Sequence, residues 1–166
     1  MKLTNRKLLV LIVVPMFYGC VTHSSDELSD LRVAFRNFQP NETILRLEIA
    51  TYYDWDCIVD YNQRSHPLAG ALFFTDSGVY YFVGERSEKI SIKGLRPEHI
   101  TAARLREHWT YENISDVRID DGPLLANCLV IHDKTWVKTN FGLIGGGSKG
   151  GLKANYEFVL EKIGKE

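Results

Sequence analysis

The side chains best suited to covalent chemistry in this chain are its three cysteines. Cys57 precedes His66 and Cys128 precedes His132, each within one short stretch of sequence. A thiol beside an imidazole can act as a nucleophile activated by a base, which is the chemistry of cysteine hydrolases. Neither pair has a recognisable third group to orient the imidazole. A disulfide between Cys57 and Cys128, or two buried reduced thiols, are therefore the alternatives.

A glycine-rich segment at 142–151 is the second place where chemistry is conceivable. Backbone N–H groups at a helix N-terminus attract anions, and Lys149 would add positive charge. A nucleotide-binding P-loop needs Gly-Lys followed by Ser or Thr, whereas this chain has Ser148, Lys149 and then Gly150. The motif fails, and Gly147 to Gly150 form a candidate loop for an anion or a partner, with a flexible connection as the alternative.

Histidine spacing does not predict a metal site. No two of the five histidines stand four residues apart, the spacing that places two ligands on one helix face. We therefore expect no metal and no cofactor. Among the aromatic residues, Tyr53, Trp55 and Trp136 are candidates for an exposed recognition surface, and packing in the core or on a sheet face is the alternative.

The N-terminus has a basic start at residues 2–7, an apolar run at 8–17 and a small residue, Gly19, before Cys20. This segment resembles the signal peptide and lipobox of bacterial lipoproteins, although Phe17 and Tyr18 are bulkier than usual. The apolar run is too short to span a bilayer as a helix. The alternatives are a plain secretory signal and an uncleaved N-terminal anchor.

The resemblance implies that residues 1–19 are removed and that acyl chains on Cys20 attach the protein to a membrane. Residues 20–42 would then be a tether containing a short helix, and residues 43–166 the folded domain. Residue 21 is valine, not the aspartate that favours inner-membrane retention in Gram-negative lipoproteins. We therefore expect a cell-envelope location, and in a Gram-negative host the outer membrane facing the periplasm rather than the inner membrane.

Length and charge exclude several functional classes. Removal of residues 1–19 leaves 166 − 19 = 147 residues, which suits one domain. The removed part carries three basic and no acidic residues, so 20 − 3 = 17 basic residues remain against 21 acidic ones, a net charge of −4. Nucleic acid is not an expected partner, and we do not expect clustered basic residues to bind anionic lipid.

Apolar periodicity predicts the elements of the domain. Residues 26–38 have the three-and-four spacing of an amphipathic helix, and residues from 42 onwards alternate as a half-buried strand through Leu45, Leu47 and Ile49. A turn at Thr75–Gly78, with a glycine able to take positive φ, predicts a hairpin. The remaining predictions are strands at 57–61, 87–92 and 111–120, an ambiguous segment at 98–108, a hairpin at 125–141 turning at 133–134, and an amphipathic helix at 152–163.

Three segments, 72–80, 111–117 and 154–163, resemble in this order the motifs of bacterial pleckstrin-homology-like (PH-like) domains. The resemblance implies a mainly β fold: a small barrel or sandwich of about seven antiparallel strands, capped by a C-terminal amphipathic helix. It also implies a binding module. The better-known phosphoinositide binders of that superfamily use a basic loop after the first strand, and residues 53–56 are acidic here. Phosphoinositide binding is therefore not expected.

The sequence thus predicts a membrane-anchored, non-catalytic binding or assembly module with an envelope protein as partner. Two alternatives are a carrier or sensor of a small apolar ligand held inside the barrel, and an envelope hydrolase.

Overall fold

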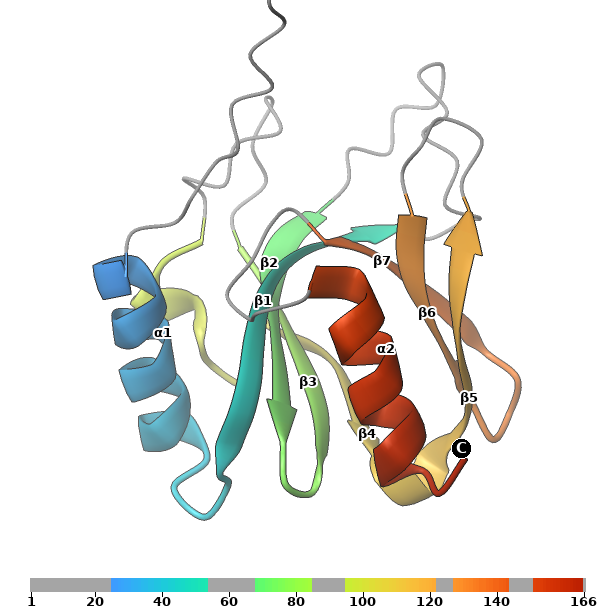
Figure 1. Ribbon diagram of the computed structural model, residues 1–166. Helices are drawn as coiled ribbons and strands as arrows, with labels where there is room; N and C mark the ends of the chain where they lie inside the picture. Colours follow the sequence, from blue (N-terminus) through green and yellow to red (C-terminus); the bar gives the residue numbers. More distant parts are fainter. Residues whose placement is uncertain (1–24, 54–67, 85–94, 122–126, 144–150, 166) are drawn as a thin grey trace, which may run out of the picture.

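A computed structural model describes residues 25–53, 68–84, 95–121, 127–143 and 151–165 (Figure 1). Its centre is one antiparallel seven-stranded sheet with the order β4-β3-β2-β1-β7-β6-β5. The fold class, mainly β with a C-terminal helix, is confirmed. The strands are β1 (Ile44–Tyr53), β2 (Leu68–Thr75), β3 (Gly78–Val83), β4 (Leu105–Thr110), β5 (Ile114–Asp121), β6 (Asn127–Asp133) and β7 (Lys138–Leu143).

Helix α1 (Ser25–Phe38) covers the outer face of the first half of the sheet, β1–β4 (Figure 1). Its apolar residues recur every three or four positions, so they form one stripe that packs on this face. Phe35 is fully buried, and its ring stacks on Phe73 of β2 with 4.4 Å between centroids. The helix expected at 26–38 is confirmed.

Helix α2 (Gly151–Lys162) packs on the inner side of the sheet (Figure 1). Residues from all seven strands and from α2 belong to one buried cluster, which means that the sheet curls around a common interior. The predicted apolar face of the helix does face this interior. Closure by a helix covers apolar surface that the open side of a curled sheet would otherwise expose.

The β2–β3 hairpin is confirmed, but its glycine has a different role from the predicted one. The Thr75 hydroxyl accepts hydrogen bonds from the backbone N–H of Ser77 at 3.3 Å and of Gly78 at 3.1 Å. Gly78 does not take positive φ. Instead a Cβ at this position would lie 2.2 Å from the Trp109 carbonyl oxygen, so the close approach of β4 requires glycine.

Burial along β1 contradicts the half-buried prediction. Leu45 is 42% exposed, whereas Glu48 and Ala50 are buried along with Leu47 and Ile49. The reason is that β1 lies at the middle of the curled sheet, between α1 on the outside and the shared interior. Alternation indicates one buried face only where the other face meets water.

The remaining elements differ from the predictions mainly at their ends. The ambiguous segment contains a short 3-10 helix, η2 (Pro97–His99), and β4; a second one, η3 (Tyr111–Asn113), precedes β5. In the C-terminal hairpin, β7 begins at Lys138 and not at Thr135, because the turn is longer than predicted. The strands expected at 57–61 and 87–92 lie outside the described residues.

Candidate functional site

The turn between β6 and β7 is built around the carboxylate of Asp133. Its Oδ1 accepts hydrogen bonds from the backbone N–H of Thr135 at 2.8 Å, the Thr135 hydroxyl at 2.7 Å and the backbone N–H of Val137 at 3.0 Å. The N–H of Asp133 donates to the Val137 carbonyl at 3.2 Å and closes the loop. Short polar side chains commonly organise turns in this way.

Trp136 is the last residue of this three-residue loop and has a φ of 63°. Such hairpin loops place their last residue in the left-handed region, where glycine is usual. For a residue with a Cβ, this conformation costs roughly 1–2 kcal/mol of conformational free energy. The Trp136 side chain is nevertheless 69% exposed, and Val137 beside it is 57% exposed. The turn therefore holds a large apolar side chain in water.

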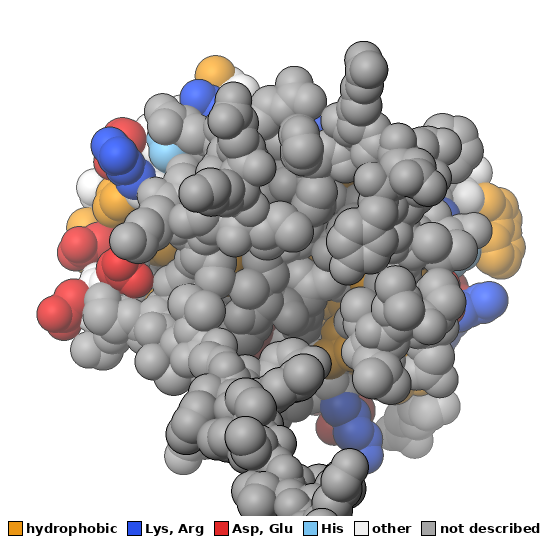
Figure 2. All heavy atoms as spheres, turned by 90° about the horizontal axis from the view of Figure 1, so that it is seen from above, with side chains coloured by type: hydrophobic (Ala, Val, Ile, Leu, Met, Phe, Trp, Pro, Cys, Tyr) orange, Lys and Arg blue, Asp and Glu red, His pale blue; other side chains and the backbone are white. Residues whose placement is uncertain are grey.

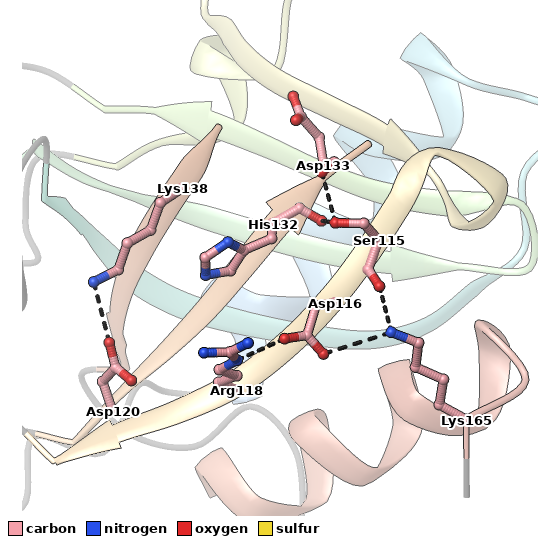
Figure 3. A network of polar contacts seen from close by, with 8 residues as sticks. All are labelled: Ser115, Asp116, Arg118, Asp120, His132, Asp133, Lys138 and Lys165. Carbon is pink, nitrogen blue, oxygen red and sulfur yellow. Dashed lines mark hydrogen bonds and ion pairs between the residues drawn. The ribbon is translucent and has the colours of Figure 1, made fainter. Parts of the chain in front are cut away.

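Strand register places a polar network next to this turn, on the outer face of β5–β7 (Figure 3). His132 pairs with Lys138 on one side and with Asp116 on the other. Arg118 Nε lies 2.6 Å from Asp116 Oδ2, and Lys165, beyond the end of α2, lies 3.7 Å from Asp116 Oδ1.

The same network ties the hairpin to its neighbours. Ser115 Oγ lies within hydrogen-bond distance of the Asp133 carbonyl at 2.6 Å, and Lys138 pairs with Asp120 at 3.1 Å (Figure 3). The Lys134 N–H donates to the Asn113 carbonyl at 2.9 Å. The base of the turn is thus connected to both β5 and η3, so these two elements hold the backbone that carries Trp136.

The carboxylates of Asp133 and Asp116 are held ionised. Hydrogen bonds from the Thr135 hydroxyl, and from the N–H groups of Val137 and Thr135, lower the pKa of Asp133 below its ordinary value. Partial burial would raise the pKa of Asp116, but the hydrogen bond and charge of Arg118, with the charge of Lys165, lower it. Both groups accept hydrogen bonds as anions at neutral pH.

This arrangement is suited to recognition. An indole offers a large, stiff apolar surface with one N–H donor, and such residues dominate the binding energy of many protein interfaces. The His132 ring meets Trp136 edge to face with 6.2 Å between centroids, so the indole is supported at its base. We call Trp136, Val137, His132 and Lys138 the hairpin surface.

Of the predicted site residues, the structure describes Trp136, Cys128 and the backbone of Tyr53. Trp136 is exposed, as a recognition residue must be, and Tyr53 ends β1 opposite Asn140 of β7. Cys20, Cys57, Trp55 and the loop Gly147 to Gly150 lie outside the described residues.

Cys128 is fully buried on β6 and disulfide-bonded. Because the chain has three cysteines, its partner is either Cys20 or Cys57. A bonded sulfur cannot serve as a nucleophilic thiolate, so the Cys128–His132 pair is wrong as a catalytic proposal. The pairing of Cys57 with Cys128 stays a prediction.

The other described histidines, His99 and His108, contact neighbouring residues of the fold. His99 is buried, and its Nδ1 accepts a hydrogen bond from the Arg96 N–H at 3.1 Å. His108 stacks on Tyr80 with 4.0 Å between ring centroids, and burial lowers its pKa. Within the described ranges, no group of three or more histidine, cysteine or carboxylate side chains is placed to hold a metal ion.

A second polar cluster lies at the β2–β3 turn. Glu42 accepts hydrogen bonds from the Ser77 hydroxyl at 2.6 Å and the Tyr80 hydroxyl at 3.1 Å. Asp76 accepts one from the Thr43 N–H at 2.9 Å. These contacts join the α1–β1 connection to the hairpin. Their geometry is that of a structural clasp, because the carboxylates are already occupied by neighbouring donors.

Sequence reasoning missed two features. The role of Asp133 had a signal, since Asp and Thr separated by one residue often form side-chain-stabilised turns. Asn155 of α2 had none: it is fully buried among apolar residues, and neither side-chain atom has a hydrogen-bond partner among the described residues. No helix among those residues is both long and apolar enough to cross a membrane.

No protein-family model and no curated protein matches the chain. Among solved structures, it is similar to the C-terminal domain of an unknown protein from Leishmania infantum, with a TM-score of 0.50 and 11% sequence identity. The match covers 83% of this chain and 98% of that one. At this identity the similarity concerns the fold alone.

Proposed function

We propose that this chain is an envelope lipoprotein with a PH-like domain, and that it acts as a membrane-tethered, non-catalytic binding module. In this proposal acyl chains on Cys20 hold the protein on a bilayer, and the hairpin surface binds a protein partner. The chemistry of the first twenty residues supports the anchor. A disulfide at Cys128 fits an exported protein, because such bonds persist in oxidising compartments.

The observation that carries the binding role is the exposure of Trp136 in a strained and well-supported turn. An indole in water contributes little to folding, so the domain gains no evident stability from it. Strained backbone that surrounding contacts hold in place is concentrated at functional sites in proteins. The hydrogen bonds to Asp133 hold the backbone of the turn in one conformation before a partner arrives, which reduces the entropy lost on binding.

The alternatives have less support. A carrier of an apolar ligand needs an internal cavity of several hundred cubic ångströms. The described interior is instead occupied by aromatic side chains, with Tyr81 and Phe141 5.0 Å apart and Trp109 6.0 Å from Phe141. A hydrolase would need a nucleophile beside a base, and the disulfide at Cys128 removes one of the two imagined pairs.

The binding role is tested by replacing Trp136 with alanine in the full chain and purifying the protein from membranes after crosslinking. We expect loss of a partner protein that the wild type captures, because truncating a central aromatic anchor costs at least about 2 kcal/mol, or roughly thirtyfold in affinity. Val33→Ala is the matched control, since Val33 is also exposed but lies on α1. Equal capture by both variants would refute the role of Trp136.

The anchor is tested separately by intact-mass analysis of the membrane-extracted protein. We expect a chain that begins at Cys20 and carries fatty acids. A chain that begins at Met1, or one without acyl groups, would remove the anchor from the proposal without affecting the test of Trp136.

A further inference from the structure

Helix α1 and the hairpin surface lie on opposite sides of the domain. α1 packs on the outer face of β1–β4, whereas Trp136 joins β6 and β7 in the other half of the sheet (Figure 1). Figure 2 keeps the left–right arrangement of Figure 1. It shows acidic side chains, together with basic and hydrophobic ones, at the edge where α1 lies, and mainly hydrophobic and basic side chains at the opposite edge.

The chain between the anchor and α1 is short. Five Cα steps separate Cys20 from Ser25, the first residue of α1. A fully extended chain of this length reaches about 18 Å. A compact domain of this size is roughly 35 Å across. The tether is therefore too short to pass around the domain, and the α1 side must stay near the bilayer that holds the acyl chains.

The start of α1 is acidic, so it can lie near the bilayer without binding anionic lipid. Asp26, Glu27 and Asp30 lie at the start of the helix and are exposed. Carboxylates are not attracted to anionic headgroups, so the start of α1 adds no electrostatic attraction to the hydrophobic attachment.

From this placement we infer an orientation: the start of α1 faces the anchoring bilayer, and the hairpin surface faces the aqueous compartment. This inference rests on the proposed acylation of Cys20. The occupant of the hairpin surface is then a protein that approaches from the aqueous side. The lipid of the anchoring bilayer is the other environment that favours an exposed indole. It is excluded because the tether is too short for the hairpin surface to reach that bilayer.

The test uses the acylated full chain in native membranes, with a photoreactive benzoylphenylalanine at position 136 in one variant and at position 29 in another. Ser29 is the matched site because it is exposed and lies on α1, near the anchor. After irradiation, mass spectrometry counts lipid and protein adducts at each position. We expect protein adducts at position 136 and lipid adducts enriched several-fold at position 29.

Lipid adducts at position 136 equal to or above those at position 29 would overturn the orientation, even if acylation is confirmed by intact mass. An unacylated chain would overturn both the anchor and the orientation. Replacing Asp133 by alanine in the position-136 variant provides a further check: a loosened turn is expected to reduce protein adducts at least several-fold without increasing lipid adducts.

Discussion

Trp136 occupies a backbone conformation that bulky residues rarely adopt, and its surroundings explain how it is held there. The Asp133 carboxylate accepts three hydrogen bonds from the loop, each with a net contribution of roughly 0.5–1.5 kcal/mol. Their sum is comparable to the roughly 1–2 kcal/mol that a left-handed conformation costs. The strain at Trp136 and the hydrogen bonds that offset it therefore lie within five consecutive residues. A substitution can remove one of them without the other.

Replacing Trp136 by glycine and by alanine tests the strain directly. Alanine keeps the Cβ that disfavours positive φ and glycine does not, so we expect the glycine variant to be more stable by about 1 kcal/mol. The free energies of unfolding are measured by urea denaturation. If the alanine variant were equally stable, the turn would have to place this residue at negative φ.

The two helices of the domain pack on opposite faces of the sheet, with α1 on the outer face of β1–β4 and α2 on the inner face, mainly against β5 and β6. Phe35 of α1 contacts Phe73 and Tyr80 on the outer face, and α2 packs on the inner face. Both faces of β1 are therefore covered, and α1 contributes to the core although it precedes the first strand. Substitutions in the two helices are expected to change the free energy of unfolding in opposite directions.

For α1, we expect Phe35→Ala to lower the free energy of unfolding by roughly 3–5 kcal/mol, because the substitution removes a fully buried ring and leaves a cavity. Val33→Ala on the exposed face of the same helix is expected to change it by less than about 0.5 kcal/mol. Chemical denaturation compares the two. Similar small effects would mean that α1 detaches from the sheet in solution.

For α2, we expect Asn155→Leu to stabilise the protein by about 1 kcal/mol or more. A buried amide without hydrogen-bond partners among the described residues loses its hydration on folding, whereas the similarly branched side chain of leucine has no polar group to desolvate. Lys153→Leu, on the exposed face of α2, is the control and is expected to have little effect. A less stable Asn155→Leu variant would show that the amide has a bonding partner, such as an ordered water.

At the scale of the whole molecule, a covalent bond joins segments that are distant in sequence. Cys128 is disulfide-bonded, and a lipid group attached to the Cys20 sulfur would prevent that sulfur from forming a disulfide, leaving Cys57 as the partner. A bond between positions 57 and 128 would close a loop of about 70 residues and contribute at most about 4 kcal/mol.

Peptide mapping of the unreduced protein is expected to find Cys57 linked to Cys128. Reduction should lower the free energy of unfolding by up to about 4 kcal/mol, and it should have no such effect on a chain in which both cysteines are alanine. A Cys20–Cys128 link would refute this pairing and the acylation of Cys20 together.

The sequence by itself determined the elements whose signals are local. The spacing of Leu31 and Phe35 predicts α1, the Thr75–Gly78 turn predicts the β2–β3 hairpin, and the apolar stripe ending at Ile163 predicts α2. Each of these signals depends on contacts within a few residues or on the period of one element. They predicted these three elements, and the mainly β class was predicted from the resemblance of three segments to PH-like domains.

Only the tertiary structure decided which faces are buried and which side chains meet. Glu48 is buried because α1 and the shared interior cover both sides of β1, and Asn155 is buried because α2 closes the curled sheet. Trp136 was one of three aromatic candidates, and its exposure depends on a turn that points away from the core. Burial results from how distant elements pack, and the pattern of one segment does not contain that information.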